Sequence, residues 1–268
     1  MVRVGIRRCR TIMGRSGIGG IDYAVNPYLG CEHGCVYCYA RFMSRMGHSG
    51  EEWGSFVDVK VNALERLRKE ASQKRRGVVM LSSVTDPYQP VERRFELTRG
   101  SLQILLEYGF PVVVQTKSDL VLRDLDLLRR FDDCEVGFTI TTIDEEVRRA
   151  FEPRSSPVPA RLAALRKLSE AGVETYAFLG PMLPYLSEEG LGKLLDELAE
   201  CVGRVIVDRL NIKCGNLQSI RRVLLHHYPD LGQLFESALS PGSGYYDRLK
   251  RDVAAMCRGR AIPYDFCY

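Results

Sequence analysis

The chain has 268 residues, 45% of them apolar, and a net charge of +4, so it can bury a substantial core. No apolar run approaches the ~20 residues that a membrane span needs, and the charged N-terminal stretch has no apolar segment behind it, unlike a secretory signal. We therefore expect a cytoplasmic protein with no membrane association. Its nine cysteines, an odd number, then serve as metal ligands and buried thiols rather than as disulfides.

Residues 1–20 are predicted to form a basic N-terminal arm. Five arginines fall within its first fifteen residues: Arg3, Arg7, Arg8, Arg10 and Arg15. Arginines at this density can neutralise phosphates, which favours contact with DNA or RNA. A solvated tail explains the same composition equally well.

From residue 21 onward, the pattern is a strand followed by a helix. Apolar β-rich runs predict strands at 22–26, 78–82, 111–116, 135–141, 173–179 and 204–208. Helical periodicity predicts helices at 39–47, 60–74, 98–108, 120–130, 159–171 and 187–202. In the last of these helices, Ser187 is the predicted N-cap, because acidic residues follow it in the first turn.

Six such βα units imply a parallel sheet with right-handed crossovers. The sheet is either open and doubly wound or an incomplete barrel. We expect this core to cover residues 21–215 and a C-terminal helical extension, residues 216–268, to pack on it.

Polar side chains follow several of the predicted strands. In parallel α/β folds the reactive groups gather at these carboxyl ends, although strand ends are also polar simply because they reach solvent. The residues in these positions are Thr85, Asp86, Lys117, Ser118, Thr141, Thr142, Asp208, Asn211 and Lys213.

Three cysteines follow the first predicted strand. Cys31, Cys35 and Cys38 have the spacing C-x3-C-x2-C. A structural zinc site needs four ligands, and Cys9, His33 or Cys267 could supply the fourth. A [4Fe–4S] cluster fits better, because three thiolates can hold three irons and leave the fourth iron open for chemistry.

The stretch NPYLGCEHGCVYCYAR, with Tyr37 before the last cysteine, resembles the radical S-adenosylmethionine (SAM) superfamily. This resemblance implies a (β/α)6 partial TIM barrel. It also implies that SAM binds the open iron and is cleaved reductively to a 5′-deoxyadenosyl radical, which takes hydrogen from a substrate. The stretches SSVTDPYQPVE, LTRGSLQILLEYGFPVVVQTKSDL and FEPRSSPVPARLAAL further resemble the spore photoproduct lyase-like group, also called DNA repair photolyase-like.

The resemblance also implies roles for single residues. Tyr37 would lie along the adenine, Thr85 would touch the methionine part of SAM with Asp86 beside it, and Lys117 would face the carboxylate of SAM. Either Thr139 or Thr141 would lie near the ribose or sulfonium, and Tyr39 would relay a radical. Ordinary structural roles explain the same residues: the threonines as strand residues, Tyr37 as a core side chain and Lys117 as a solvated lysine.

One position departs from the family pattern. Spore photoproduct lyases carry a hydrogen-donating cysteine where this chain has Ser83, and a serine hydroxyl is a poorer hydrogen-atom donor than a thiol. Cleavage of a thymine dimer in spores is therefore not supported by the sequence. Cys267 could supply a thiol if the C-terminal tail folds back to the barrel mouth, although a buried structural thiol is the plainer reading.

The leading hypothesis is a radical SAM enzyme that uses a [4Fe–4S] cluster, SAM and a one-electron donor such as ferredoxin or flavodoxin. Its favoured substrate class is nucleic acid or nucleotide, in a repair-like or a modifying reaction. A radical SAM enzyme that modifies tRNA or peptides is the alternative within the same class. A zinc or iron–sulfur protein that binds nucleic acid without catalysis is the alternative outside it.

Overall fold

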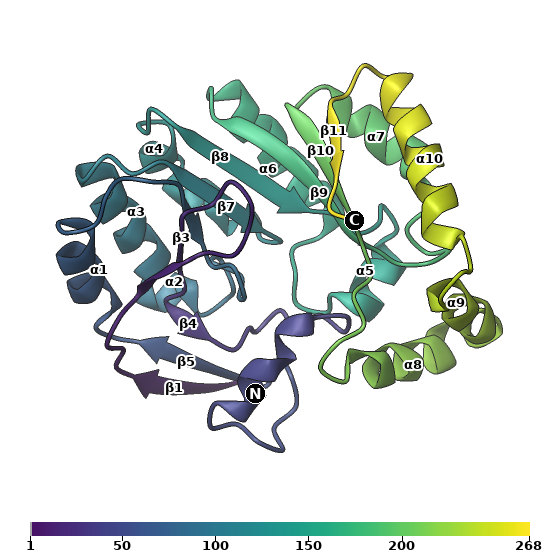
Figure 1. Ribbon diagram of the computed structural model, residues 1–268, viewed down its shortest axis with the longest axis horizontal. Coiled ribbons are helices and arrows are strands. Elements are labelled where there is room, and N and C mark those ends of the chain that lie inside the picture. Colours follow the sequence, from purple (N-terminus) through teal and green to yellow (C-terminus); the bar gives the residue numbers. More distant parts are fainter. Residues whose placement is uncertain (1) are drawn as a thin grey trace.

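The computed structural model describes residues 2–268, and an eight-stranded sheet forms its centre (Figure 1). Six strands run parallel and lie side by side in the order in which the chain makes them: β3 (Tyr23–Val25), β6 (Val79–Leu81), β7 (Val112–Thr116), β8 (Cys134–Thr139), β9 (Glu174–Met182) and β10 (Arg204–Arg209). Every predicted strand is present, and this order is that of a (β/α)6 partial TIM barrel. The predicted fold class is confirmed.

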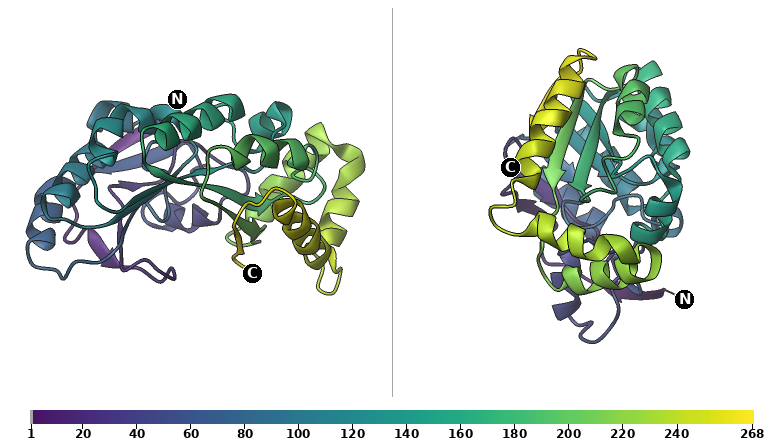
Figure 2. Two further views of the ribbon diagram at one scale, coloured as in Figure 1. Left: turned by 90° about the horizontal axis from the view of Figure 1, so that it is seen from above. Right: turned by 90° about the vertical axis from the view of Figure 1, so that its right-hand side faces the viewer.

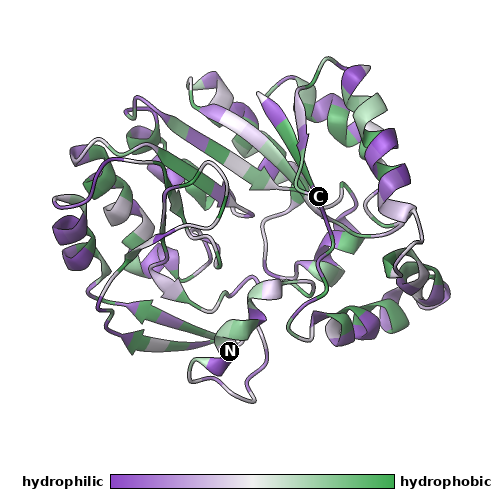
Figure 3. Cartoon of the chain, viewed as in Figure 1, coloured by the Kyte–Doolittle hydropathy of each residue, from purple (hydrophilic) through white to green (hydrophobic). Residues whose placement is uncertain are grey.

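Helices follow the strands and cover the outer face of the sheet (Figures 1 and 2). Those of the barrel are η1 (Tyr39–Arg45), α1 (Ala63–Ala71), α2 (Glu92–Phe95), α3 (Leu97–Glu107), η2 (Asp119–Asp124), α4 (Leu125–Leu128), α5 (Glu145–Phe151), α6 (Val158–Glu170) and α7 (Leu191–Ala199), where η marks a 3₁₀ helix. Figure 3 shows apolar residues along the strands and a mixture of apolar and polar residues on the helices.

The two faces of the sheet differ in burial. Val112, Val114, Val136 and Phe138 are fully buried and belong to the main core, as alternation along a strand predicts for one face. Gln115, which follows Val114 in β7, is only partly buried. The second face is therefore the polar one, and it forms the inside of the partial barrel.

The predicted start of the helix at 187–202 is wrong. The helix α7 begins at Leu191, after Gly190 in the left-handed conformation. Ser187 instead accepts a hydrogen bond on its side-chain oxygen from the Leu183 amide at 2.8 Å. The serine therefore belongs to a separate turn before the helix, because its hydroxyl bonds an upstream amide and not one in α7.

The basic N-terminal residues are built into two sheets. Strand β1 (Arg3–Arg7) pairs in parallel with β5 (Phe56–Lys60), and β5 pairs with β4 (Tyr28–Leu29). Strand β2 (Met13–Arg15) pairs antiparallel with β3. The prediction of a basic N-terminal arm did not include these strands, because two isolated short strands carry little periodic signal.

The C-terminal segment is mostly helical but also adds a strand. It contains α8 (Asn216–His227), η3 (Pro229–Leu231), α9 (Gly232–Leu239) and α10 (Tyr245–Arg258), and then β11 (Tyr264–Phe266), which pairs in parallel with β10. The tail does fold back onto the sheet, as Figure 1 shows. No helix of the described residues is long and apolar enough to cross a membrane.

Candidate active site

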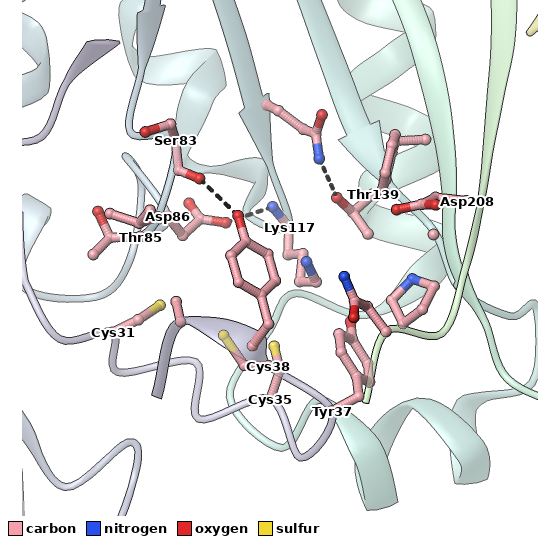
Figure 4. Close-up of a pocket in the computed structure, with 18 of the residues that line it drawn as sticks. Cys31, Cys35, Tyr37, Cys38, Ser83, Thr85, Asp86, Lys117, Thr139 and Asp208 are labelled. Carbon is pink, nitrogen blue, oxygen red and sulfur yellow. Dashed lines mark hydrogen bonds between the residues drawn. The ribbon is translucent and has the colours of Figure 1, made fainter. Parts of the chain in front are cut away.

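A cavity of about 380 Å³ opens at the carboxyl ends of the parallel strands. We call it the inner cavity. The cysteine loop lies on one side of it and the strand ends on the other, as Figure 4 shows. Of the residues predicted from the sequence, those that line it are Cys31, Cys35, Tyr37, Cys38, Tyr39, Ser83, Thr85, Asp86, Lys117, Thr139, Asp208 and Asn211.

The cysteine loop curls through two tight turns. The amide of Gly34 donates to the carbonyl of Cys31, and the amide of Cys38 donates to that of Cys35, each at 3.2 Å. Gly30 has a φ of +86°, and a side chain there would collide with Phe56. Glycine is therefore required at this position by both conformation and space.

The three thiols suit an iron–sulfur cluster. All three are free, and all line the inner cavity. Burial raises their pKa values, that of Cys35 to about 12, so the thiolate form needs a nearby positive charge such as that of iron. Within residues 2–268, no three His, Cys, Asp or Glu side chains meet as ligands of one ion, whereas a cluster offers each thiol its own iron.

Behind Tyr37 lies a buried ion pair. The tyrosine hydroxyl donates to the Glu152 carboxylate, which pairs with Arg161 at 2.5 Å, and both charged side chains are fully buried. Burial alone would raise the pKa of Glu152, but the charges of Arg161 and Lys117 and the bond from Tyr37 lower it to about 2. Glu152 therefore stays ionised and fixes the ring of Tyr37 against the cavity.

Lys117 carries its charge into the inner cavity. Its ammonium lies 5.8 Å from the centroid of the Tyr37 ring. Burial acts to lower the pKa of Lys117, but Cys35, Glu152 and Asp86 together raise it above its ordinary value. The site thus holds a charged lysine that can face an anionic group.

Asp86 is occupied by structural bonds. Its two carboxylate oxygens accept from the Thr116 hydroxyl at 2.7 Å and from the Lys117 amide at 2.8 Å, and His33 Nδ1 lies 3.3 Å away. Burial opposes ionisation, yet these partners lower the pKa of Asp86 to about 2. Asp86 joins the end of β6 to that of β7, and its predicted contact with the cofactor stays a prediction.

Thr85 presents an unused hydroxyl. Its Oγ1 is buried and has no hydrogen-bond partner among residues 2–268. Because Thr85 also lines the inner cavity, a ligand there could satisfy this group.

Only one of the two threonines considered together lines the cavity. Thr139 does, and its hydroxyl accepts from the Gln115 amide at 3.2 Å. Thr141 lies outside the lining and donates to Glu152 at 3.2 Å. The geometry therefore favours Thr139 for contact with a ligand and gives Thr141 a part in positioning Glu152.

Tyr39 reaches across the cavity to the end of β6. It is 46% exposed, and its hydroxyl donates to the Ser83 carbonyl at 3.2 Å. The Ser83 hydroxyl accepts from Asn26 at 3.3 Å. The position that carries a cysteine in related lyases is thus a hydroxyl on the cavity wall, close to the predicted relay residue.

Cys267 is near this end of the sheet but does not enter the lining. Its amide donates to the Val207 carbonyl at 3.0 Å, next to Asp208, and the residue is exposed. The tail therefore returns to the β10 edge of the sheet, as a donor at the barrel mouth would require, but the thiol stays outside the inner cavity.

Several residues of the site were not assigned from the sequence. Glu152 is one of them, and its side chain pairs with Arg161. Asn216 donates to the Tyr37 carbonyl at 2.8 Å and so ties the start of α8 to the cysteine loop. The stretch FEPRSSPVPAR already contained both members of the ion pair, nine residues apart, but no helical spacing joins them.

Comparison with known proteins identifies the class. Residues 25–198 match the Radical SAM superfamily, and the chain belongs to it. An uncharacterized protein of Methanocaldococcus jannaschii is 35% identical over 80% of this chain and 79% of its own length. A protein of Pseudomonas phage M6 named "Radical SAM Nalpha-GlyT isomerase" is 24% identical over 65% of this chain and 36% of its own length.

Solved structures agree on the fold. Spore photoproduct lyase with bound AdoMet and dinucleoside spore photoproduct superposes with a TM-score of 0.60 at 22% identity, over 84% of this chain and 66% of that one. Streptococcus suis SuiB, bound to the precursor peptide SuiA, gives 0.52 at 15% identity, over 78% of this chain and 46% of that one. The chain thus spans just under two thirds of the lyase. Enzymes of its superfamily use a [4Fe–4S] cluster and SAM.

Proposed function

We propose that this protein cleaves SAM reductively and directs the resulting radical at a nucleic acid or nucleotide. When bound, the cluster and SAM supply one electron and a carbon-centred radical that abstracts hydrogen. The observation that carries the proposal is the inner cavity, where three buried thiols lie beside a charged lysine and an unpartnered threonine hydroxyl.

The residues of the chain divide this work between them. Cys31, Cys35 and Cys38 hold the cluster, and Lys117 meets the carboxylate of SAM. Tyr37, held by Glu152, offers a fixed aromatic surface to the adenine. Each of these groups is positioned before any ligand arrives, so little reorganisation is needed when the radical forms.

A nucleobase suits the part of the cavity that faces these groups. Thr139 offers a hydroxyl from β8 and Asp208 a carboxylate from β10, on either side of β9, and burial raises the pKa of Asp208. Tyr39, half exposed, offers a ring on which a base can stack. One similar protein supports the same class, because spore photoproduct lyase is bound to a dinucleoside spore photoproduct.

The test is the yield of 5′-deoxyadenosine when candidate substrates are added to the anaerobic, cluster-loaded enzyme. Irradiated DNA, tRNA, free nucleotides and a peptide mixture are compared with enzyme and SAM alone. A nucleic acid or nucleotide should raise the yield. When the substrate carries deuterium, the deuterium should appear in the 5′-deoxyadenosine. Stimulation by the peptide mixture alone would contradict the substrate class but leave SAM cleavage intact.

A further inference from the structure

A second cavity, of about 250 Å³, lies on the other side of the cysteine loop, and we call it the outer cavity. The loop contributes Gly34 and Val36 to it. Its other lining includes Trp53 and three arginines, Arg41, Arg154 and Arg222. In Figure 1 the segments that meet here, η1 and the start of α8, lie on the same side of the molecule.

The cysteine loop separates the two cavities and is only one residue thick. Along the loop, His33, Cys35 and Tyr37 line the inner cavity, while Gly34 and Val36, which alternate with them, line the outer cavity. A molecule seated in the outer cavity would therefore contact the backbone that holds the cluster ligands. It would not need to enter the inner cavity.

The arginines of the outer cavity hold their charges without acidic partners. Arg41 donates to the Ser219 hydroxyl at 2.8 Å and to the Val36 carbonyl at 2.7 Å. Arg154 donates to the carbonyls of Glu32, at 2.9 Å, and of Gly54.

Arg222 reaches only a hydroxyl, that of Ser219, at 3.5 Å. None of these three arginines forms an ion pair within residues 2–268, whereas the adjacent Arg221 pairs with Glu236 at 2.5 Å. Glu52 is the one acidic residue of the lining. The outer cavity is therefore cationic and suited to carboxylates.

We propose that the outer cavity is the docking site for an acidic one-electron carrier protein. This inference rests on the proposed function, which requires an electron from outside. In the step that docking serves, the reduced carrier loses one electron, and the cluster held by Cys31, Cys35 and Cys38 gains it. No atom is transferred, and no bond forms or breaks.

The position and size of the outer cavity favour a redox protein over a nucleic acid. A nucleic-acid substrate must reach the inner cavity, which opens on the other side of the loop. Electron-transfer complexes are small and are guided by opposite charges, so a compact cationic cavity beside the cluster loop is sufficient. Only one residue of the loop separates the outer cavity from the cluster ligands, which gives an electron a short path from a docked carrier.

Charge reversal at Arg222 tests the proposal. The dissociation constant of a purified acidic flavodoxin is measured by titration, on the cluster-loaded and on the cluster-free protein. Arg222→Glu should weaken binding by about tenfold, as expected for a like charge placed in a small electrostatic interface. Arg221→Glu, one residue away on the same helix and outside the cavity, changes the net charge equally and should leave binding within about twofold.

A second variant is expected to change flavodoxin affinity in the opposite direction. Glu52→Gln removes the acidic side chain of the lining and should tighten flavodoxin binding, so a folding defect cannot imitate the result. Reduction of the cluster by dithionite, which needs no docking, should be equal in all variants. Failure of SAM cleavage would overturn the proposed function, while the docking site is judged by the dissociation constants alone.

The proposal is overturned if Arg222→Glu and Arg221→Glu weaken flavodoxin binding to the same extent, or if Glu52→Gln does not tighten it. It is also overturned if a single-stranded oligonucleotide binds the outer cavity, which would show as loss of oligonucleotide affinity in Arg222→Glu but not in Arg221→Glu. Flavodoxin binding that weakens as the salt concentration rises, and that responds less to salt in Arg222→Glu, would support the proposal.

Discussion

Lys117 is the cation that the inner cavity offers to an anionic ligand. Replacing it with alanine should weaken SAM binding by about 1.5–3 kcal/mol, the range for a hydrogen bond to a charged group. Equilibrium binding of SAM to the cluster-loaded protein measures the effect. Lys167→Ala, an exposed lysine on α6, is the control, and equal affinities for the two variants would reject the role.

Glu152 and Arg161 form a fully buried pair, and breaking it should be costly. Glu152→Gln leaves the arginine charge buried without its partner and should lower the free energy of unfolding by about 3–5 kcal/mol. Chemical denaturation of the cluster-free protein measures this. Glu236→Gln, at an exposed pair, should change stability little, and a similar loss in both variants would contradict the account.

The same carboxylate predicts a pH dependence. The folded pKa of Glu152, about 2, lies below the ordinary value of about 4.3. Its charge therefore contributes stability that is fully present above pH 4.3 and is lost as the pH falls from there toward 2. Denaturation at several pH values in this window should show a steeper loss for the native protein than for Glu152→Gln, and parallel curves would refute the assignment.

The sequence predicted the site residues that lie on local motifs. The cysteine spacing, and Tyr37, Thr85 and Lys117 at loop or strand ends, could be assigned because each position is set by its own short stretch. Glu152 and Asn216 could not be placed, because both contact Tyr37 from far along the chain and no helical spacing joins Glu152 to Arg161. The choice between Thr139 and Thr141 likewise needed the direction of each side chain.

At the scale of elements, the inner face of the sheet is shaped by a glycine. Gly137 in β8 lies opposite Tyr176 in β9, and a side chain there would collide with the Tyr176 ring. The Tyr176 hydroxyl donates to Gln115, which in turn donates to Thr139 on the cavity wall. The glycine thus makes room for a chain of contacts that ends at the inner cavity.

Gly137→Ala should therefore destabilise the fold by about 1–3 kcal/mol, the usual cost of overpacking a core. Urea denaturation measures this change. Gly14→Ala, in β2, has open space around the new methyl group and should be tolerated. If both variants unfold at the same urea concentration as the native protein, the packing argument fails.

The six parallel strands of the barrel were predictable from the sequence, and the strands added at its edges were not. Strands such as β7 and β8 carry continuous apolar runs bounded by helices with clear periodicity. Strands β1, β4 and β11 are two to five residues long and form only by pairing with distant strands, so nothing local marks them. The start of α7 was misplaced because Ser187 caps a turn, which has the same local signal as a helix cap.

For the whole molecule, a (β/α)6 partial barrel brings residues from five strands and the cysteine loop to one cavity. Its class follows from the cysteine motif and is confirmed by the superfamily match over residues 25–198. The substrate does not follow from the fold, since one scaffold of this kind serves different substrates through its loops.

The most direct measurement is the formation of 5′-deoxyadenosine from SAM by the anaerobically reconstituted, dithionite-reduced protein. The native protein should bind about four irons per chain and form 5′-deoxyadenosine. Cys35→Ala should lose both the cluster and the product. A cluster-loaded native protein that leaves SAM intact, or a Cys35→Ala variant that still forms 5′-deoxyadenosine, would contradict the account.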